Sequence, residues 1–267
     1  MRKSEVALDH KDLALSVARE AGELIKNYVG GQFQVEEKSS VFDLVTEVDR
    51  ESELLIRKRI NEYNPAHKII GEEGVDQEDI SILLESDDYI WVIDPIDGTT
   101  NFVHGLPGYS VSIALVHKKE VILGVVYDPS LDEMFSAEKG KGAFLNGESI
   151  HISNIHLLEH SVLSTGFPSD IEGARANVIK GIDEIAPVCS NLRSFGSAAL
   201  HLAYVATGRL EGFWEYNLNA WDIAAGYLLV KEAGGKVSDL SGSPYHLTTR
   251  NILATNGQVH EQLLGRL

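Results

Sequence analysis

The sequence predicts a mixed α and β protein, with an α+β N-terminal half followed by an α/β C-terminal half. Over residues 13–28, apolar residues recur at the spacing of one helical face. Residues 109–146 instead contain short β-rich segments separated by charged or Pro, Gly and Asp turns, a pattern typical of an antiparallel meander. After about residue 152, strand-like and helix-like segments alternate. We therefore expect two tightly packed domains, residues 1–152 and 153–267.

The elements of the N-terminal half have local signals. A second helix is expected from near Thr46 or Asp49 to about Tyr63, and Pro65 closes it. Two short apolar runs that stop at acidic residues are interpreted as buried strands, 68–70 and 89–93. The strands of the meander are expected at 109–117, 121–127 and 133–137.

The C-terminal half is expected to alternate between strands and helices. Gly234 and Gly235 end its last long helix, because glycine accepts the left-handed conformation of a C-cap. The expected strands are 161–165, 210–214, 236–239 and 252–255, and the expected helices are 174–186, 197–207 and 220–233.

Composition limits the possible functions. The 267 residues carry a formal net charge of −17, which argues against a nucleic-acid groove or an anionic membrane as partner. Cys189 is the only cysteine, so neither an internal disulfide nor a cysteine-based zinc site is expected. The N-terminus has no apolar signal segment, and no apolar run approaches the roughly 20 residues that span a bilayer. We therefore expect a cytoplasmic protein without a membrane or nucleic-acid partner.

The most informative segment is 91–102, WVIDPIDGTTNF. A buried strand delivers Asp94 at its end and Asp97 follows within one turn, so the two carboxylates are expected to converge. Gly98 permits close approach of the backbone to a ligand, and the amides around Gly98 and Thr99 are expected to face an anion.

Two other acidic residues accompany this segment: Glu72 follows another predicted strand, and Asp222 falls near a predicted helix start. Like charges about 4 Å apart repel by roughly 4 kcal/mol at an effective dielectric near 20, so several carboxylates share a site fully ionised only with cations. All-oxygen ligands suit a hard cation, and Mg²⁺ binds through carboxylates together with substrate phosphate. Bound ions would also let an acidic protein attract phosphate. The acidic residues therefore predict a magnesium site.

Five segments, in order, resemble the inositol monophosphatase family of lithium-sensitive, Mg²⁺-dependent phosphatases. The resemblance extends from about residue 13 to about residue 255. It implies a layered αβαβα fold, a homodimer, and hydrolysis of a small phosphorylated metabolite by in-line attack of water without a covalent intermediate. The segments are 43–49 (DLVTEVD), 71–73 (GEE), 94–99 (DPIDGT), 196–199 (GSAA) and 221–226 (WDIAAG).

The resemblance also implies roles for individual residues. The metal ligands, around two or three Mg²⁺ ions, would be Glu72, Asp94, Asp97, Asp222 and the carbonyl of Ile96. The catalytic residues would be Asp49, Glu72 and Thr99, with Asp49 orienting Thr99 to position the attacking water. The phosphate would be held by Gly98 and Thr99, alongside the metal ligands Glu72, Ile96, Asp97 and Asp222. The hydroxyl-bearing body of the substrate would contact Gly196, Ser197, Ala198 and Glu215.

The resemblance leaves the substrate open. Asn219 and Ala220 stand where animal members commonly carry His-Cys, and Phe213 and Trp214 make the surroundings of Glu215 bulkier. Inositol monophosphate is the first expectation, because Glu215 and the 196–198 segment match that pattern. Fructose 1,6-bisphosphate, NADP, histidinol phosphate and adenosine bisphosphate are the alternatives, because relatives with similar metal sites hydrolyse them.

Other interpretations stay open at this point. Asp49 and Asp222 both suit a helix N-terminus, and Thr46 with Asp49 forms a partial capping box. A phosphatase of the haloacid dehalogenase type has its paired Asp residues two apart, whereas Asp94 and Asp97 are three apart. A non-catalytic regulatory or binding protein that keeps the fold is the third candidate. The H-x-x-E-H pattern at 156–160 is interpreted as a coincidence.

Overall fold

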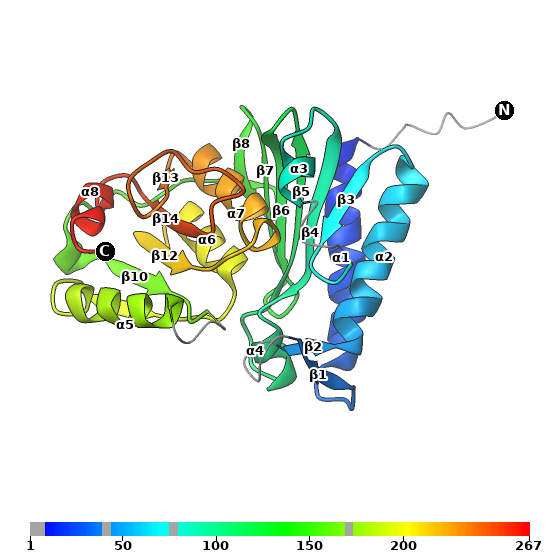
Figure 1. Ribbon diagram of the computed structural model, residues 1–267, viewed down its shortest axis with the longest axis horizontal. Helices are drawn as coiled ribbons and strands as arrows, with labels where there is room; N and C mark the ends of the chain where they lie inside the picture. Colours follow the sequence, from blue (N-terminus) through cyan, green and yellow to red (C-terminus); the bar gives the residue numbers. More distant parts are fainter. Residues whose placement is uncertain (1–8, 39–43, 75–79, 169–172) are drawn as a thin grey trace.

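Over the residues that the computed structural model describes (9–38, 44–74, 80–168 and 173–267), the elements stack in five layers (Figure 1). Helices α1 (His10–Tyr28) and α2 (Glu47–Tyr63) form the first layer, on one face of a seven-stranded sheet. Helices α6 (Ala198–Ala206) and α7 (Ala220–Glu232) separate this sheet from a five-stranded one. Helices α5 (Ala174–Ile185) and α8 (His260–Leu264) form the last layer. This order confirms the predicted αβαβα fold class.

The larger sheet contains the predicted meander. Its strands follow the chain in the order β3 to β9, and all neighbours are antiparallel except β3 and β4. The first five are β3 (Lys68–Gly71), β4 (Tyr89–Asp97), β5 (Ser110–His117), β6 (Glu120–Asp128) and β7 (Glu133–Glu138). The last two, which the sequence did not predict, are β8 (Gly142–Leu145) and β9 (Glu148–Ile150). A hairpin of β1 (Val35–Glu37) and β2 (Leu44–Thr46) precedes α2, and the short helix α3 (Ile80–Leu84) precedes β4.

The smaller sheet has the strand order β11-β10-β12-β14-β13. Strands β10 and β12 run parallel, as the alternation of strands and helices predicts, and β14 returns antiparallel between β12 and β13. The bounds are β10 (Val162–Thr165), β11 (Asn191–Arg193), β12 (Gly212–Tyr216), β13 (Lys236–Ser238) and β14 (Asn251–Thr255). All four strands predicted for this half are therefore present, with β11 in addition.

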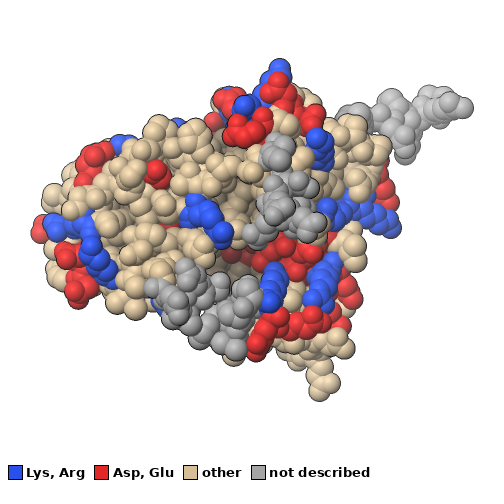
Figure 2. All heavy atoms as spheres, in the orientation of Figure 1, with Lys and Arg blue, Asp and Glu red and all other residues tan. Residues whose placement is uncertain are grey.

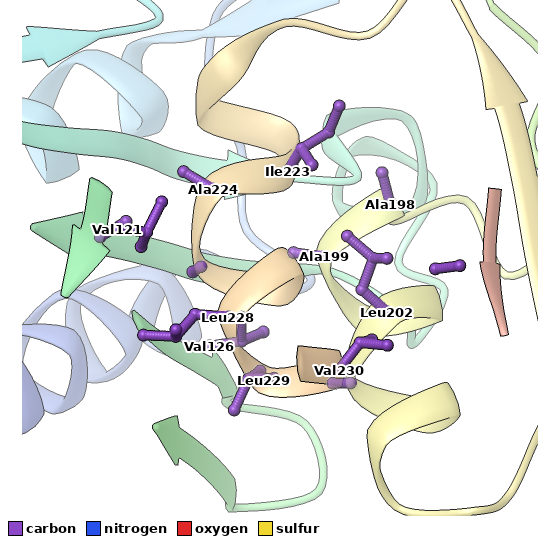
Figure 3. Close-up of a cluster of buried hydrophobic side chains, with 14 of the residues drawn as sticks. Val121, Val126, Ala198, Ala199, Leu202, Ile223, Ala224, Leu228, Leu229 and Val230 are labelled. Carbon is purple, nitrogen blue, oxygen red and sulfur yellow. The ribbon is translucent and has the colours of Figure 1, made fainter. Parts of the chain in front are cut away.

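The largest hydrophobic core lies around α6 and α7 and joins both halves of the chain (Figure 3). Two glycines allow α7 to approach its neighbours closely. A Cβ on Gly124 of β6 would lie 2.6 Å from the Ala225 carbonyl oxygen, and one on Gly226 would lie 2.5 Å from the Leu202 side chain. The sheet, α7 and α6 are thus in tight contact, while the division at residue 152 stays a prediction. No helix in the described ranges is long and apolar enough to cross a membrane.

Aromatic rings and histidines cluster where α1 begins and β4 enters the sheet. The Tyr89 ring stacks between His67 and His117, at centroid distances of 4.9 and 3.8 Å, and His10 lies 5.5 Å from His67. Trp91 Nε1 donates to His67 Nδ1 at 3.1 Å, which requires that nitrogen to be unprotonated. Burial lowers the pKa of His67, and the charges of the neighbouring histidines lower it further. Burial also lowers the pKa of His10, with Asp9 opposing the shift and His117 adding to it. The cluster therefore favours neutral histidines.

We expect the substitution His10→Phe to make the protein more resistant to acid. A histidine whose pKa is lowered by folding contributes stability that is lost as pH falls below the ordinary value near 6.5, and phenylalanine cannot be protonated. The difference in melting temperature, variant minus wild type, should increase by on the order of 2 °C when the pH is lowered from 7.5 to 5.5. Thermal melts of both proteins, with the exposed His156→Phe as the control, measure this. A difference that does not vary with pH would contradict the prediction.

Candidate functional site

The two aspartates of β4 are held on the same side of the sheet by a β-bulge. Residues three apart on a regular strand point to opposite faces. Between the pairs Asp94↔Ser112 and Asp97↔Ser110, however, β4 advances three residues while β5 advances two. The extra residue returns Asp97 to the side of Asp94. Both aspartates are buried, with 2% and 8% of their surfaces exposed.

Glu72 and Asp222 join this pair from other elements. Strand β3 runs parallel to β4 with Gly71 opposite Ile93, so the next residue, Glu72, lies level with Asp94. Asp222 lies in the first turn of α7, where its carboxylate accepts a hydrogen bond from Asn219 N at 2.6 Å. The pKa of Asp94 is well above its usual range, because of burial first and then the charges of Glu72, Asp97 and Asp222. The structure thus brings together the four predicted carboxylates.

Asp97 connects β4 to the start of α6. Its carboxylate accepts hydrogen bonds from Ser197 Oγ and Ala199 N, both at 2.6 Å, and from Ala198 N at 3.3 Å. Burial raises the pKa of Asp97 to about 6, against the opposing effect of these hydrogen bonds. Gly196 precedes them with a φ of 85°, a conformation that favours glycine. The predicted substrate-contact segment, Gly196 to Ala198, therefore lies against a predicted metal ligand.

Thr99 and Asp49 are in direct contact, as expected. Thr99 Oγ1 lies 3.1 Å from Asp49 Oδ1 and 3.0 Å from the Ile96 carbonyl oxygen, so its single proton serves one acceptor at a time. The capping box is also present, since Asp49 Oδ2 accepts from Thr46 N at 2.8 Å. Burial raises the pKa of Asp49 to about 6, although hydrogen bonds from Thr46 work in the opposite direction. Asp49 therefore caps α2 and orients Thr99 with different oxygens.

Glu215 is a buried carboxyl group that faces the same cluster from β12. Burial raises its pKa well above the usual range, and the charges of Asp222 and Asp97 add to the shift. Within the described residues no hydrogen bond to its carboxyl group is found, although the residue is only 7% exposed. A Cβ on Gly166 would lie 2.1 Å from Glu215 Oε2, so glycine makes room for it. Phe213 is fully buried in the core around α6 and α7.

A lysine that sequence reasoning missed supplies positive charge at one side of the cluster. Lys38, at the end of β1, contacts Glu72 Oε1 at 2.8 Å and also bonds to Glu73. Burial disfavours its charged form, but the charges and hydrogen bonds of Glu72 and Glu73 raise its pKa overall. Its position in a polar hairpin gave no signal, because the partners lie more than 30 residues away along the chain. Asp43, within the first family segment, lies outside the described residues.

The donor set fits a hard cation, although the side chains are turned toward local partners. In the described ranges, no three His, Cys, Asp or Glu side chains already surround one point as metal ligands would. Glu72 pairs with Lys38, Asp94 Oδ1 accepts from Ile96 N at 3.0 Å, and Asp97 and Asp222 accept at helix starts. All donors are oxygens, and their mutual repulsion is what Mg²⁺ would relieve. Figure 2 shows acidic side chains along a hollow on this face of the molecule.

Comparison with known proteins gives a consistent result. A family model described as the inositol monophosphatase family matches residues 9–267. The fructose-1,6-bisphosphatase/inositol-1-monophosphatase of Thermotoga maritima is 42% identical over 96% of this chain and 95% of its own length. The Nus factor SuhB of Pseudomonas aeruginosa is 44% identical over 95% of this chain and 93% of its own. The solved structure of a Thermotoga maritima IMPase has a TM-score of 0.86 at 41% identity, over 95% of this chain and 94% of that one.

We expect Asp94→Asn to stabilise the metal-free protein while removing its response to Mg²⁺. The carboxylates with raised pKa values destabilise the fold as pH rises through those values, and a neutral amide relieves the repulsion. At pH 8 in chelator the variant should melt about 2–4 °C above wild type, the shift that roughly 1 kcal/mol produces at this size. This difference in melting temperature should become smaller as the pH is lowered toward 5.

Thermal melts with and without Mg²⁺ measure both effects. Asp128→Asn is the matched control, because Asp128 is also buried with a raised pKa but its carboxylate bonds to Ser130 N and Leu131 N, outside the site. Mg²⁺ should raise the melting temperature of wild type and of this control alike. A rise of the same size in Asp94→Asn would contradict the role given to Asp94.

Proposed function

The chain belongs to the inositol monophosphatase family and is a phosphoric monoester hydrolase, and we propose that it hydrolyses inositol monophosphate with Mg²⁺ as its cofactor. The observation that carries this proposal is the buried carboxylate cluster. Glu72, Asp94, Asp97 and Asp222 come from three separate places in the chain, and burial first, then neighbouring carboxylate charges, raises the pKa of both Asp94 and Asp222. Such a cluster binds divalent cations because they offset its repulsion.

The proposed chemistry divides among the residues of the cluster. Glu72, Asp94, Asp97, Asp222 and the Ile96 carbonyl would hold two or three Mg²⁺ ions, which supply a lowered water pKa and neutralise charge on the phosphate. When Thr99 Oγ1 donates its hydrogen bond to Asp49, its lone pairs are free to accept a hydrogen bond from the attacking water. Glu72 would act on the attacking water as well, together with Asp49 and Thr99. No residue needs to form a covalent intermediate.

The phosphate would lie against the turn that begins α4 (Thr99–Val103). Gly98 there has a φ of 99°, and a Cβ on it would lie 2.8 Å from the Gly108 carbonyl oxygen. Only glycine allows the backbone to turn this tightly, which leaves the amides of the turn free to approach a ligand. The body of the substrate would contact Gly196, Ser197, Ala198 and Glu215. The unpartnered carboxyl group of Glu215 supports a contact with a hydroxyl group.

The proposal extends to the class of substrate, the partners and the location of the protein. The substrate is a small phosphorylated metabolite, and the charge of −17 disfavours nucleic acid as a partner. We also propose a cytoplasmic homodimer that lithium inhibits. Fructose 1,6-bisphosphate is the alternative substrate with the most support, because the Thermotoga relative is named for both activities. NADP and histidinol phosphate complete the set to be tested.

A regulatory role is the second candidate function. Relatives from Pseudomonas aeruginosa and Escherichia coli, 44% and 42% identical, are called Nus factor SuhB, a name that denotes a factor rather than a hydrolase. Such a role would use the fold without turnover, or in addition to it. A protein that binds Mg²⁺ but releases no phosphate from any of the candidate esters would favour it.

Phosphate release from a panel of esters tests the proposal directly. We expect turnover that requires Mg²⁺, falls with Li⁺, and is greatest on inositol monophosphate. In Asp94→Asn it should fall by more than about 100-fold, the upper end of what loss of an outer-shell partner of a metal costs. Activity that survives in this variant, or that persists in chelator, would contradict the assignment.

Glu215→Gln should change which substrate the protein prefers more than it changes the rate of hydrolysis common to all esters. A contact with the leaving group contributes to the recognition of one substrate against another, whereas the metal site acts on every ester. We expect kcat/KM for inositol monophosphate to fall by at least about tenfold relative to that for a generic aryl phosphate. The ratio of the two constants, measured in both proteins, is the readout. Equal losses on both substrates would rule out a recognition role.

A further inference from the structure

An ion pair on α2, with a buried carboxylate and a partly exposed guanidinium, packs against the turn that carries Glu72. Glu53, with 3% of its surface exposed, accepts a hydrogen bond from Arg57 Nε at 2.7 Å through Oε1. Its other oxygen, Oε2, accepts from the backbone N of Glu73 at 2.8 Å. Arg57 Nη1 donates to the Ile69 carbonyl oxygen at 3.4 Å. The pair therefore bonds to the backbone both before and after Glu72.

The turn is shaped around this carboxylate. A Cβ on Gly71 would lie 2.6 Å from Glu53 Oε2, and one on Gly74 would lie 2.8 Å from Oε1 and 2.9 Å from Arg57 Nη2. These distances are shorter than real Cβ contacts, so glycine at both positions lets the backbone wrap the pair. Glu72 lies between two points of close contact with α2.

The same helix also carries Asp49. Residues 49 and 53 are one turn apart, so their side chains lie on neighbouring positions of one helical face. Asp49 bonds to Thr99, the first residue of the short helix that follows β4, while Glu53 bonds to the turn after β3. One turn of α2 thus sets the distance between two parts of the site that follow different strands.

Stability alone is a weak explanation for the pair. Burying the Glu53 charge costs desolvation energy that its attraction to the partly exposed Arg57 only partly returns, so an apolar side chain would serve a purely structural purpose as well. Arg57 Nη2 is in addition buried without a hydrogen-bond partner in the described part of the chain. An apolar pair, however, could not accept the hydrogen bond from the Glu73 amide.

We propose that Glu53 and Arg57 are positioning residues that set the metal affinity of the site by fixing the turn that carries Glu72. This inference rests on the proposed function, because Glu72 matters only if it holds an ion. Partners that orient the ligands of a metal typically contribute 10–100-fold in affinity or activity. Disrupting the pair should therefore weaken Mg²⁺ binding about tenfold.

The test is Glu53→Gln in the full chain. The amide oxygen of glutamine can still accept from one donor, but its NH₂ group cannot accept from the other, so either the bond from Arg57 or the bond from the Glu73 amide is lost. We expect the Kd for Mg²⁺, from isothermal titration calorimetry, to rise about tenfold. The kcat at saturating Mg²⁺ should stay within about threefold of wild type, because the turn is restored once the metal is bound.

Two further variants keep the result interpretable. Glu62→Gln, on the same helix, removes an exposed carboxylate that pairs with Lys58 and Arg59, and should leave the Kd for Mg²⁺ unchanged. Gly74→Ala keeps both charges but drives a methyl group against them, and should weaken Mg²⁺ binding in the same direction as Glu53→Gln. It provides the measurement if Glu53→Gln does not fold.

The outcomes separate this inference from the proposed function. Lower melting temperatures with an unchanged Kd for Mg²⁺ in Glu53→Gln and Gly74→Ala would overturn the positioning role and leave a structural one. A wild-type protein that binds Mg²⁺ but hydrolyses no ester would overturn the proposed function, while the Kd comparison would still decide the role of Glu53. A wild-type protein that binds no Mg²⁺ would overturn both.

Discussion

Repulsion among buried carboxylates is the constraint on which the site depends. Asp94 and Asp97 are buried, and the partly buried Asp222 lies beside them. Burial first, and then the charges of neighbouring carboxylates, raises the pKa of Asp94 and of Asp222. The fold offsets this cost with partial positive charge. Helices α2, α6 and α7 all begin at the site, and a carboxylate accepts a backbone N–H near each start: Asp49 at α2, Asp97 at α6 and Asp222 at α7. The positive ends of helix dipoles and the Lys38 ammonium thus partly neutralise the cluster. Divalent cations would supply the remainder.

The layered fold follows from the need to deliver these residues to one point. Strand β4 supplies two aspartates, and its parallel neighbour, the edge strand β3, ends level with the first of them. The middle layer of helices, which comes from the C-terminal half, supplies Asp222 and the amides that bind Asp97. Close contact at Gly124 fixes α7 against the sheet, and close contact at Gly226 fixes it against α6. The hydrophobic core that joins the two halves is therefore also what holds the site together.

Much of the fold was predictable because the chain's periodicities are strong. The helix over 13–28, the meander and the alternation after residue 152 correspond to α1, β5–β7 and the five-stranded sheet. Strands β8 and β9 were missed because three or four residues carry too little pattern. For the site, the convergence of Asp94 and Asp97 was predicted, but its cause was not: the bulge depends on the pairing with β5. Lys38 and Glu53 were missed for a similar reason, because each bonds across 20 or more residues of sequence.

Glu215 shows why the chemistry is easier to infer than the substrate. The aspartates have hydrogen-bond partners of their own, so their geometry follows from the fold and is independent of the ligand. Glu215 has none among the described residues, and Gly166 leaves space around its carboxyl group. Its carboxyl group is therefore available to a hydrogen-bond partner from outside the chain. The fold thus sets the geometry of the acidic cluster by itself, whereas no described residue supplies a partner for Glu215, and the proposed contact with the substrate depends on that difference.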